Sequence, residues 1–244
     1  MTSPIDRLAP AVRPPGRPAG FQRWRNLLFL HWRVPVDEIC QTLPEGVEPD
    51  LWQNEALVGI VPFTMRDVSP WWSPSVPGIS NFHELNLRTY VVKDGVPGVW
   101  FYSLDAANAL AVVVARSGWK LPYHKAAMEL HEDGDEIRYT SERRWPAPKP
   151  AIFRGRYRLG ESAGRAAPGT LEHFLVERYV LFTHDGDRLL LGRVHHEPYP
   201  LREVTLIDCE QSIIEAQGMH PQRGPHLVHY SDGVDVDVYA LEPV

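Results

Sequence analysis

The sequence predicts a β-rich α+β domain built on an antiparallel β barrel, closed or cone-like, with a few peripheral helices. Two observations predict this fold. Strand-like runs outnumber helical ones along the 244 residues, and hairpin turn signals stand between them at Lys93–Gly95, Asp133-Gly134 and Asp185-Gly186. No internal repeat of about 20 to 50 residues is present, which argues against solenoids and propellers.

The first elements are identified from their hydrophobic patterns. Residues 24–32 are apolar on both pleat faces, which predicts a strand covered on two sides. A short helix is expected after Pro35, because apolar residues from Val36 to Leu43 recur at helical spacing before Pro44 and Gly46. Residues 56–63 predict another strand. The segment 69–80 is rich in Pro and Ser and predicts a loop with an aromatic tip.

The segment 84–92 predicts a strand with two different faces. Its side chains alternate, so that one face is mostly apolar and the other mostly polar. Residues 99–104 return as its partner strand. The apolar face carries Leu85, Leu87, Thr89 and Val91, and the polar face carries Glu84, Asn86, Arg88 and Tyr90.

Three helices are expected downstream. Asp105 is suited to cap a helix over 106–116, and Thr170 one over 170–178. Asp208 and Gln211 resemble a capping box that opens a helix over 209–217, closed by Gly218. The last segment alternates from Val234 to Tyr239 and predicts a half-buried antiparallel strand.

Composition limits the function classes. The chain is 43% hydrophobic, and its formal charge of −6 argues against nucleic acid or an anionic membrane as the main partner. The N-terminus has no apolar signal segment, so a cytoplasmic location is expected. Residues 1–20 predict a mobile arm, or one that covers a neighbouring subunit of a homo-oligomer, and residues 21–244 a single domain. The best candidate for an internal boundary is the Pro-rich stretch 145–150.

Several catalytic motifs are missing. The sequence has no Gly-x-Gly-x-x-Gly, Walker A, Gly-x-Ser-x-Gly or His-Glu-x-x-His pattern. His195 and His196 are adjacent and would face opposite sides of a strand, as would His226 and His229. Solvated or hydrogen-bonded histidines are therefore favoured over a zinc site. We expect no metal and no cofactor.

The polar face of segment 84–92 is one candidate site. If the sheet closes into a barrel, Arg88 could bind a carboxylate through its planar guanidinium, and Glu84 could act as an acid or base. The alternative is a solvated outer face, as antiparallel sheets commonly have. The sequence leaves the two about equal, because alternation does not say which face meets water.

The second candidate is the segment 119–126, Trp-Lys-Leu-Pro-Tyr-His-Lys-Ala. Lys120 and Lys125 are the only lysines near a plausible site, and a lysine with a lowered pKa can form a Schiff base with a keto substrate. His124 could serve as acid or base near neutral pH. An ordinary surface lysine is the simpler alternative, since lysines are rarely buried.

Five stretches, in order, resemble the YqjF-like proteins, the family called domain of unknown function 2071. They are LLFLHW at 27–32, LPEG at 43–46, FHELNLRTYV at 82–91, GVWFYSLDA at 98–106 and ARSGWKLPYHKAA at 115–127. This family is similar to the acetoacetate decarboxylases. The resemblance implies an antiparallel β barrel or cone around a central cavity, with helices outside.

In the decarboxylases a strand glutamate and an arginine face a lysine in Tyr-Pro-Lys-Lys-Leu-Ala, and that lysine forms the Schiff base. The resemblance matches Glu84 to the glutamate. The Schiff-base position falls on His124 if the segments are aligned on the following alanine, and on Tyr123 if they are aligned on the proline. The paired lysines are absent in both alignments, so this sequence departs from the pattern that imine chemistry needs.

These observations predict an enclosed pocket for a small carboxylate or keto compound. The expected catalytic residues are Lys125, His124 and Glu84, acting in lyase-like acid–base chemistry on a carbonyl compound. The expected substrate-binding residues are Arg88, Asn86, Tyr123 and Ser103. The alternative is a non-catalytic small-molecule-binding protein on the same fold.

Overall fold

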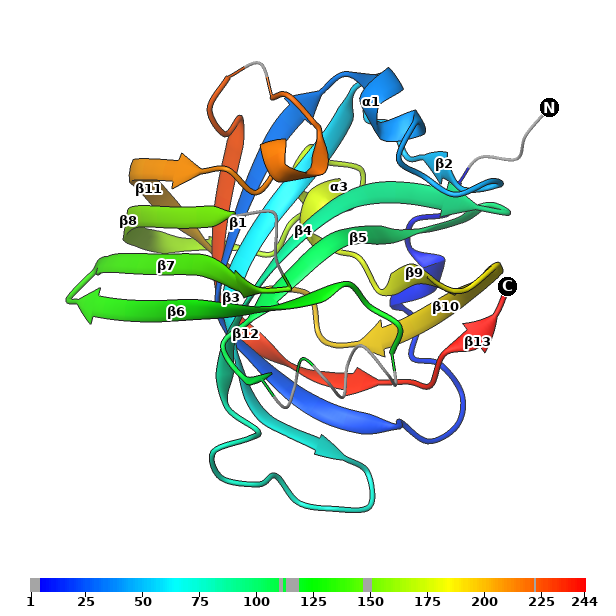
Figure 1. Cartoon of the computed structure of the whole chain (residues 1–244), viewed down its shortest axis with the longest axis horizontal. Coiled ribbons are helices and arrows are strands. Elements are labelled where there is room, and N and C mark those ends of the chain that lie inside the picture. The colour runs from blue at the N-terminus through cyan, green and yellow to red at the C-terminus, as the bar shows by residue number, and fades with distance from the viewer. Residues whose placement is uncertain (1–4, 110–111, 113–118, 147–150, 222) are drawn as a thin grey trace.

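The protein is one large, mostly antiparallel β-sheet that closes on itself, with few and short helices (Figure 1). The computed structural model describes residues 5–109, 112, 119–146, 151–221 and 223–244. Thirteen strands in this part of the chain belong to the sheet. They confirm the β-rich barrel expected from the sequence. Two pairings, β5 with β6 and β5 with β9, are parallel, so the sheet is mixed.

The strands and helices have the following bounds. The N-terminal half holds η1 (Ala9–Ala11), β1 (Gly20–Val34), α1 (Val36–Cys40), β2 (Glu48–Pro49), β3 (Ala56–Pro70), β4 (Phe82–Lys93) and β5 (Val96–Ala106). The C-terminal half holds β6 (Tyr123–Asp133), β7 (Glu136–Trp145), β8 (Ile152–Gly164), α3 (Leu171–Val176), β9 (Val180–Asp185), β10 (Arg188–His195), β11 (Leu201–Gln211), η2 (Glu215–Gln217), β12 (Leu227–Val238) and β13 (Glu242–Pro243).

Strand pairing closes two rings that share a wall. The first ring runs β12-β1-β3-β4-β5-β9-β10 and returns to β12. The second leaves β5 through β6, β7, β8 and β11 and also returns to β12. Strands β12, β1, β3, β4 and β5 belong to both rings. Each of these shared strands therefore separates two interiors.

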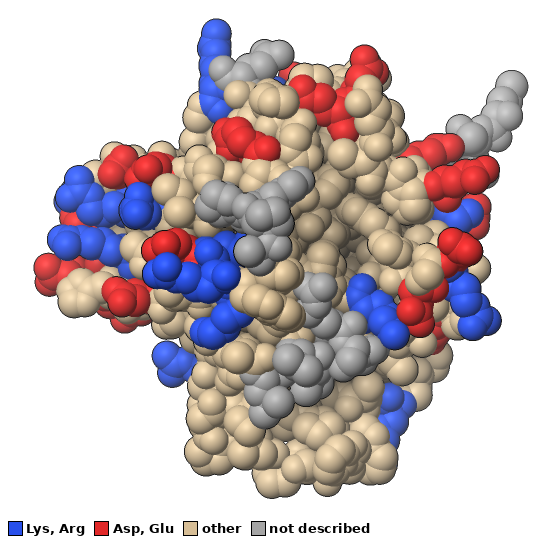
Figure 2. Space-filling view, in the orientation of Figure 1, with Lys and Arg blue, Asp and Glu red and all other residues tan. Residues whose placement is uncertain are grey.

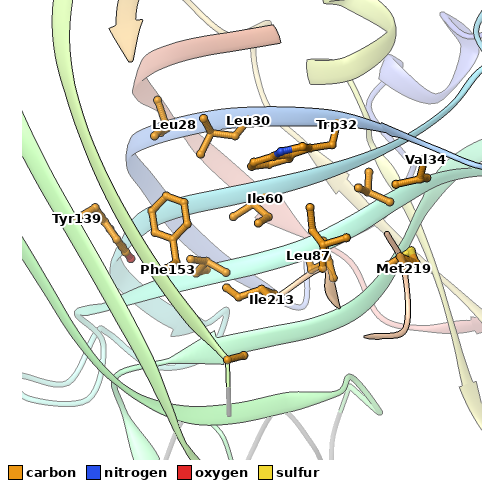
Figure 3. Packing of buried hydrophobic residues seen from close by; sticks show 14 of the residues in the cluster. Leu28, Leu30, Trp32, Val34, Ile60, Leu87, Tyr139, Phe153, Ile213 and Met219 are labelled. Atoms are coloured by element: carbon orange, nitrogen blue, oxygen red, sulfur yellow. The ribbon is translucent and has the colours of Figure 1, made fainter. Parts of the chain in front are cut away.

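Each ring encloses its own hydrophobic core. In the second ring, Leu28 and Leu30 of β1, Ile60 of β3 and Leu87 of β4 pack against Tyr139, Phe153 and Ile213 (Figure 3). The alternate residues of the same strands, including Leu27, Phe29 and Val61, pack inside the first ring. This arrangement confirms that segment 24–32 is covered on both faces, and it buries both faces of β4.

Two expected helices differ from the structure. Asp208 and Cys209 lie in β11, where they pair with Arg156 and Gly155 of β8, so the capping-box interpretation was wrong. Only the short η2 remains of that helix, ended by Gly218 in the left-handed conformation. Asp105 is the penultimate residue of β5 rather than a helix cap, and most of the helix expected over 106–116 lies outside the described residues.

Two other helices are confirmed in shortened form. The helix after Pro35 is α1, and α3 begins after Thr170, whose hydroxyl accepts a hydrogen bond from the amide of His173 at 3.3 Å. No helix in the described ranges has the length and apolar character that crossing a membrane requires.

The described part of the N-terminal segment runs along the barrel. The Arg7 side chain pairs with Asp50, Arg13 pairs with Asp237, and the amide of Ala19 donates to the carbonyl of Val238 at 2.7 Å. Strand β1 then begins at Gly20. Charged side chains gather over the projecting β6, β7 and β8, while the lower end of the molecule in Figure 2 is almost free of them.

Candidate functional site

A cavity of about 430 Å³ lies inside the first ring. All seven strands of that ring contribute to its wall, which is mainly apolar and aromatic. Pockets of this size and character are where proteins usually bind small organic molecules. Among the described wall residues, the ionisable or hydrogen-bonding side chains include Glu84, Asn86, Arg88, Tyr123, Arg178, Arg193 and Tyr199, with Gln22, Ser69, Ser73 and Ser80 toward the loop between β3 and β4.

Strand β4 sets the order of groups along the cavity. Phe82, Glu84, Asn86 and Arg88 alternate toward this side, and at about 3.3 Å per residue the row spans roughly 20 Å. The loop between β3 and β4 lies at the Phe82 end. Helix α3 covers the Arg88 end, because Arg88 Nη2 donates to the carbonyl of Leu175 at 2.8 Å. The face that the sequence left undecided is therefore interior.

Arg88 is a buried cation without an acidic partner in the described structure. Its residue is 7% exposed, and no carboxylate of the described residues lies within 4 Å of its guanidinium. Its Nε has no hydrogen-bond acceptor among the described atoms. The rings of Phe29 and Tyr90 lie 5.6 and 5.7 Å away and offer only weak compensation. Burying an unpaired charge is costly, so this site suits an anionic ligand.

The second guanidinium at this end, that of Arg178, is already neutralised. Its Nη1 donates to Oδ2 of Asp50 at 2.9 Å, and its Nε donates to the carbonyl of Phe174 at 2.7 Å. Arg7 pairs with the same Asp50 carboxylate. Nearby Glu177 interacts electrostatically with Arg88, but its carboxylate is hydrogen-bonded to the hydroxyl of Tyr179 and the amide of Tyr199 and lies beyond 4 Å of the Arg88 guanidinium. Arg88 is thus the cation of this end that is left for a ligand.

Glu84 is a carboxyl group kept neutral by its surroundings. It is 1% exposed, and burial raises its pKa to about 8, with a smaller contribution from Asp105. The hydroxyl of Tyr123 donates to Glu84 Oε2 at 2.9 Å, which opposes the rise. A carboxyl with this pKa is protonated at neutral pH, so it can donate a hydrogen bond or a proton to a carbonyl oxygen.

Asn86 lies between Glu84 and Arg88 on the same face. It pairs with Val61 on one side and with Leu104 on the other, and Leu104 pairs with Tyr123. Its Oδ1 has no hydrogen-bond partner within the described residues, although the residue is only 6% exposed. Buried polar atoms are normally satisfied, so this amide oxygen is an exception among the described residues of the cavity wall.

The structure brings together Glu84, Asn86, Arg88 and Tyr123 among the expected site residues, and it leaves Ser103 out. The register explains the exclusion. A bulge at Tyr102 separates the pair Arg88–Phe101 from the pair Leu87–Ser103. Ser103 therefore shares the face of Leu87, which packs in the other core.

His124 and Lys125 are also absent from the cavity wall. His124 pairs with Asp105, which puts its side chain on the opposite side of β6 from Tyr123. Lys125 follows Tyr123 on the cavity side, but its ammonium donates to the carbonyls of Ala107 and Ala126. His124 and Lys125 therefore do not share the cavity wall that Glu84 and Arg88 line. When the segments are aligned on the proline, the position of the Schiff-base lysine falls on Tyr123. Tyr123 is also the residue whose side chain contacts Glu84.

Sequence reasoning did not single out Arg178, Tyr199 or Leu104 as cavity residues. The one available signal was a charged pair, Glu177-Arg178, directly after the apolar run Phe174–Val176. A charge at the end of an apolar run is easily taken for a solvated helix end. No group of three His, Cys, Asp or Glu side chains in the described ranges is arranged to hold a metal ion.

Comparison with known families agrees with this architecture. Residues 21–235 match the uncharacterized conserved proteins grouped as domain of unknown function 2071. The chain belongs to this family. The uncharacterized protein YqjF of Bacillus subtilis (strain 168) is 35% identical over 220 residues, which cover 90% of each chain. The sequence resemblance is therefore confirmed for this DUF2071 protein.

Solved structures show that the DUF2071 protein has the acetoacetate decarboxylase-like fold. The acetoacetate decarboxylase of Legionella pneumophila is similar with a TM-score of 0.62 at 14% identity, over 100% of this chain and 98% of the other. The enduracididine biosynthesis enzyme MppR, solved with pyruvate, is similar with a TM-score of 0.61 at 12% identity, over 95% of this chain and 93% of the other. At these identities the likeness concerns the fold alone.

Proposed function

We propose that this DUF2071 protein binds a small carboxylate or keto compound in the cavity, with Arg88 as the carboxylate-binding residue. The observation that carries the proposal is the buried guanidinium with no acidic partner in the described structure, facing a cavity. A carboxylate placed there would supply the missing charge and accept charge-assisted hydrogen bonds. The pyruvate bound by MppR, a protein with the same fold, is a ligand of this class.

We further propose that Glu84 acts on the bound compound as a general acid. Its neutral carboxyl lies four residues along β4 from Arg88, and the hydroxyl of Tyr123 donates a hydrogen bond to one of its oxygens. An acid at this place would protonate or polarise a carbonyl group, which is the acid–base step of lyase-like chemistry. His124 and Lys125 are not part of this proposal, because neither belongs to the cavity wall.

A second candidate is a non-catalytic binding protein on the same fold. The observation that favours it is that none of the described lysines lines the cavity, so the described site has no amine for an imine. Exchange of the C3 protons of 2-oxobutanoate in D₂O, followed by NMR, separates the candidates. In this exchange a buffer base removes the C3 proton while the Glu84 carboxyl donates to the developing enolate oxygen, and the base then returns a deuteron to C3. Exchange that disappears in Glu84→Gln supports acid–base catalysis. Binding without any exchange supports the second candidate.

Binding itself is tested by calorimetry with pyruvate, acetoacetate and hexanoate, each compared with its amide. We expect each acid to bind at least tenfold more tightly than its amide, and Arg88→Leu to abolish this preference. The matched control is Arg154→Leu, which removes an exposed guanidinium of β8 in the second ring that pairs with Glu210 of β11. An acid preference that survives in Arg88→Leu would overturn the proposed role of Arg88.

A further inference from the structure

The cavity continues well beyond Arg88, Asn86 and Glu84, and its continuation is mainly apolar. Phe82 on β4 pairs with Met65 on β3, and Met65 pairs with Trp24 on β1. These three side chains form one layer of the wall, a layer outward from Glu84. Two residues of strand separate successive layers by about 6.6 Å. A ligand that reached only from Arg88 to Glu84 would leave this layer unfilled.

The mouth of the cavity is also apolar. The chain from Val68 to Phe82 contains no Asp, Glu, Lys or Arg. In this loop Trp72, Val76 and Ile79 line the cavity while remaining 71%, 48% and 39% exposed. The loop forms the lower end of the molecule in Figure 1, and Figure 2 shows that end as a surface nearly free of charge.

The ionisable groups of β4 thus lie toward one end of the cavity, and the other end is mainly apolar, with Gln22 and a few serines as its polar residues. A very small acid bound at Arg88 would leave the outer layers to water molecules with few polar partners, which is unfavourable. A ligand with an apolar body removes that water and buries its own apolar surface against the rings of Trp24 and Phe82. The chemistry of the wall therefore specifies both ends of the ligand.

We propose that the ligand is an amphipathic carboxylic acid, with its carboxylate at Arg88 and a hydrophobic body directed past Glu84 toward the loop of residues 71–80. The ligand enters and leaves through the apolar mouth under Trp72. This inference rests on the proposed role of Arg88 and adds the class of compound, an acid with a medium-length alkyl or aryl chain. The oxygen function that Glu84 contacts lies between the two ends.

A chain-length series tests the inference on the whole protein. Straight-chain carboxylates from acetate to dodecanoate are titrated by calorimetry, with the fluorescence of Trp24 and Trp119 as a second readout. Each methylene buried is worth about a fourfold gain in affinity. We expect affinity to rise at about this rate through the middle of the series and to level off once the chain reaches the mouth. Equal affinity for acetate and octanoate would overturn the inference.

A filled cavity gives the second measurement. Val68 lines the outer part of the cavity, so Val68→Trp is expected to make the affinity level off at a chain two or more methylenes shorter. Val12→Trp is the matched control, because Val12 is 72% exposed and is not part of the wall. A series that levels off at the same length in both variants would also overturn the inference. If Val68→Trp does not fold, the wild-type series still decides.

Failure of this inference differs from failure of the proposed function. Arg88→Leu can lose the preference for the acid over its amide while affinity does not change with chain length. This result would support the role of Arg88 and contradict a hydrophobic body on the ligand. Affinity can instead rise steeply with chain length while Arg88→Leu keeps the preference for the acid. This result would contradict the role of Arg88 in binding the carboxylate, and this inference rests on that role.

Discussion

The hydroxyl of Tyr123 donates a hydrogen bond to Glu84 Oε2 at 2.9 Å, from a neighbouring part of the same apolar cavity. Both residues are buried, and the pKa of each is raised, that of Glu84 to about 8. The phenol therefore keeps its proton and remains a donor over the whole neutral range. Because Oε2 of Glu84 accepts the hydrogen bond from Tyr123, the acidic proton lies on Oε1. Glu84 can therefore donate its proton only from the Oε1 side.

The raised pKa of Glu84 predicts that stability falls as pH rises. The folded protein holds this proton up to about pH 8, whereas an unfolded chain releases it near 4.5. Between these values the folded state binds more protons, so the free energy of unfolding decreases with pH. The slope contributed by one such group is up to about 1.4 kcal/mol per pH unit. Urea unfolding of the wild type and Glu84→Gln from pH 5 to pH 8 measures it.

The Gln variant should lose stability less steeply than the wild type over this interval, because it cannot ionise. Asp105, whose pKa burial raises to about 6, is present in both proteins and contributes to both slopes. The difference between the two curves therefore reports Glu84. A difference that stays constant from pH 5 to pH 8 would show that Glu84 ionises normally in the folded state.

Tyr123→Phe should move this transition to higher pH. The phenolic hydrogen bond lowers the pKa of Glu84 because it stabilises the carboxylate, so its removal leaves burial unopposed. We expect a loss of about 1 kcal/mol in stability at neutral pH as well. The same urea titrations test it, with Tyr102→Phe as a control, since Tyr102 bonds Thr42 on the far side of the sheet. A transition at lower pH would contradict the assigned donor.

The polar alternation of β4 could be predicted from sequence, but its surroundings could not. Leu85 and Leu87 alternate with Glu84, Asn86 and Arg88 whether the polar face meets water or a cavity. The polar face of β4 meets a cavity because β4 belongs to two rings at once. This arrangement depends on pairings between strands far apart in the sequence, such as β10 with β12. A single sequence carries no local signal for such pairings.

Errors in site placement have local causes of the same kind. Ser103 is expected from the sequence among the substrate-binding residues, but the bulge at Tyr102 puts it on the face of Leu87. The segment at 208–211 has the composition of a capping box, but tertiary pairing with β8 holds it in a strand. Lys125 lies on the same face of β6 as Tyr123 but is not part of the cavity wall, because its ammonium donates to the carbonyls of Ala107 and Ala126.

Imine trapping should fail on this protein. Pyruvate or acetoacetate with sodium borohydride is expected to leave the mass of the protein unchanged, because the Lys125 ammonium is held by the carbonyls of Ala107 and Ala126 outside the cavity wall. Intact-mass spectrometry followed by peptide mapping measures the result, with an imine-forming aldolase treated in parallel as the positive control. A reduced adduct on Lys125 would instead support Schiff-base chemistry by this chain.

The guanidiniums of Arg88 and Arg178 predict opposite effects on the stability of the ligand-free protein. Arg88→Leu removes a buried charge that has no acidic partner in the described structure. The carbonyl of Leu175 stays satisfied, because the hydroxyl of Tyr90 also donates to it at 2.9 Å. We therefore expect the melting temperature to stay the same or to rise.

Arg178→Leu instead breaks a buried ion pair with Asp50, whose side chain is 1% exposed. Removing one partner of such a pair costs about 3 kcal/mol, because the remaining charge is left in an apolar surrounding. Arg7 compensates only in part, since its own side chain is 32% exposed and leaves Asp50 a single solvated partner. Thermal unfolding of both variants without ligand should separate them in opposite directions. A loss of stability in Arg88→Leu as large as in Arg178→Leu would mean that Arg88 stabilises the fold, and the case for Arg88 as a carboxylate-binding residue would fall with it.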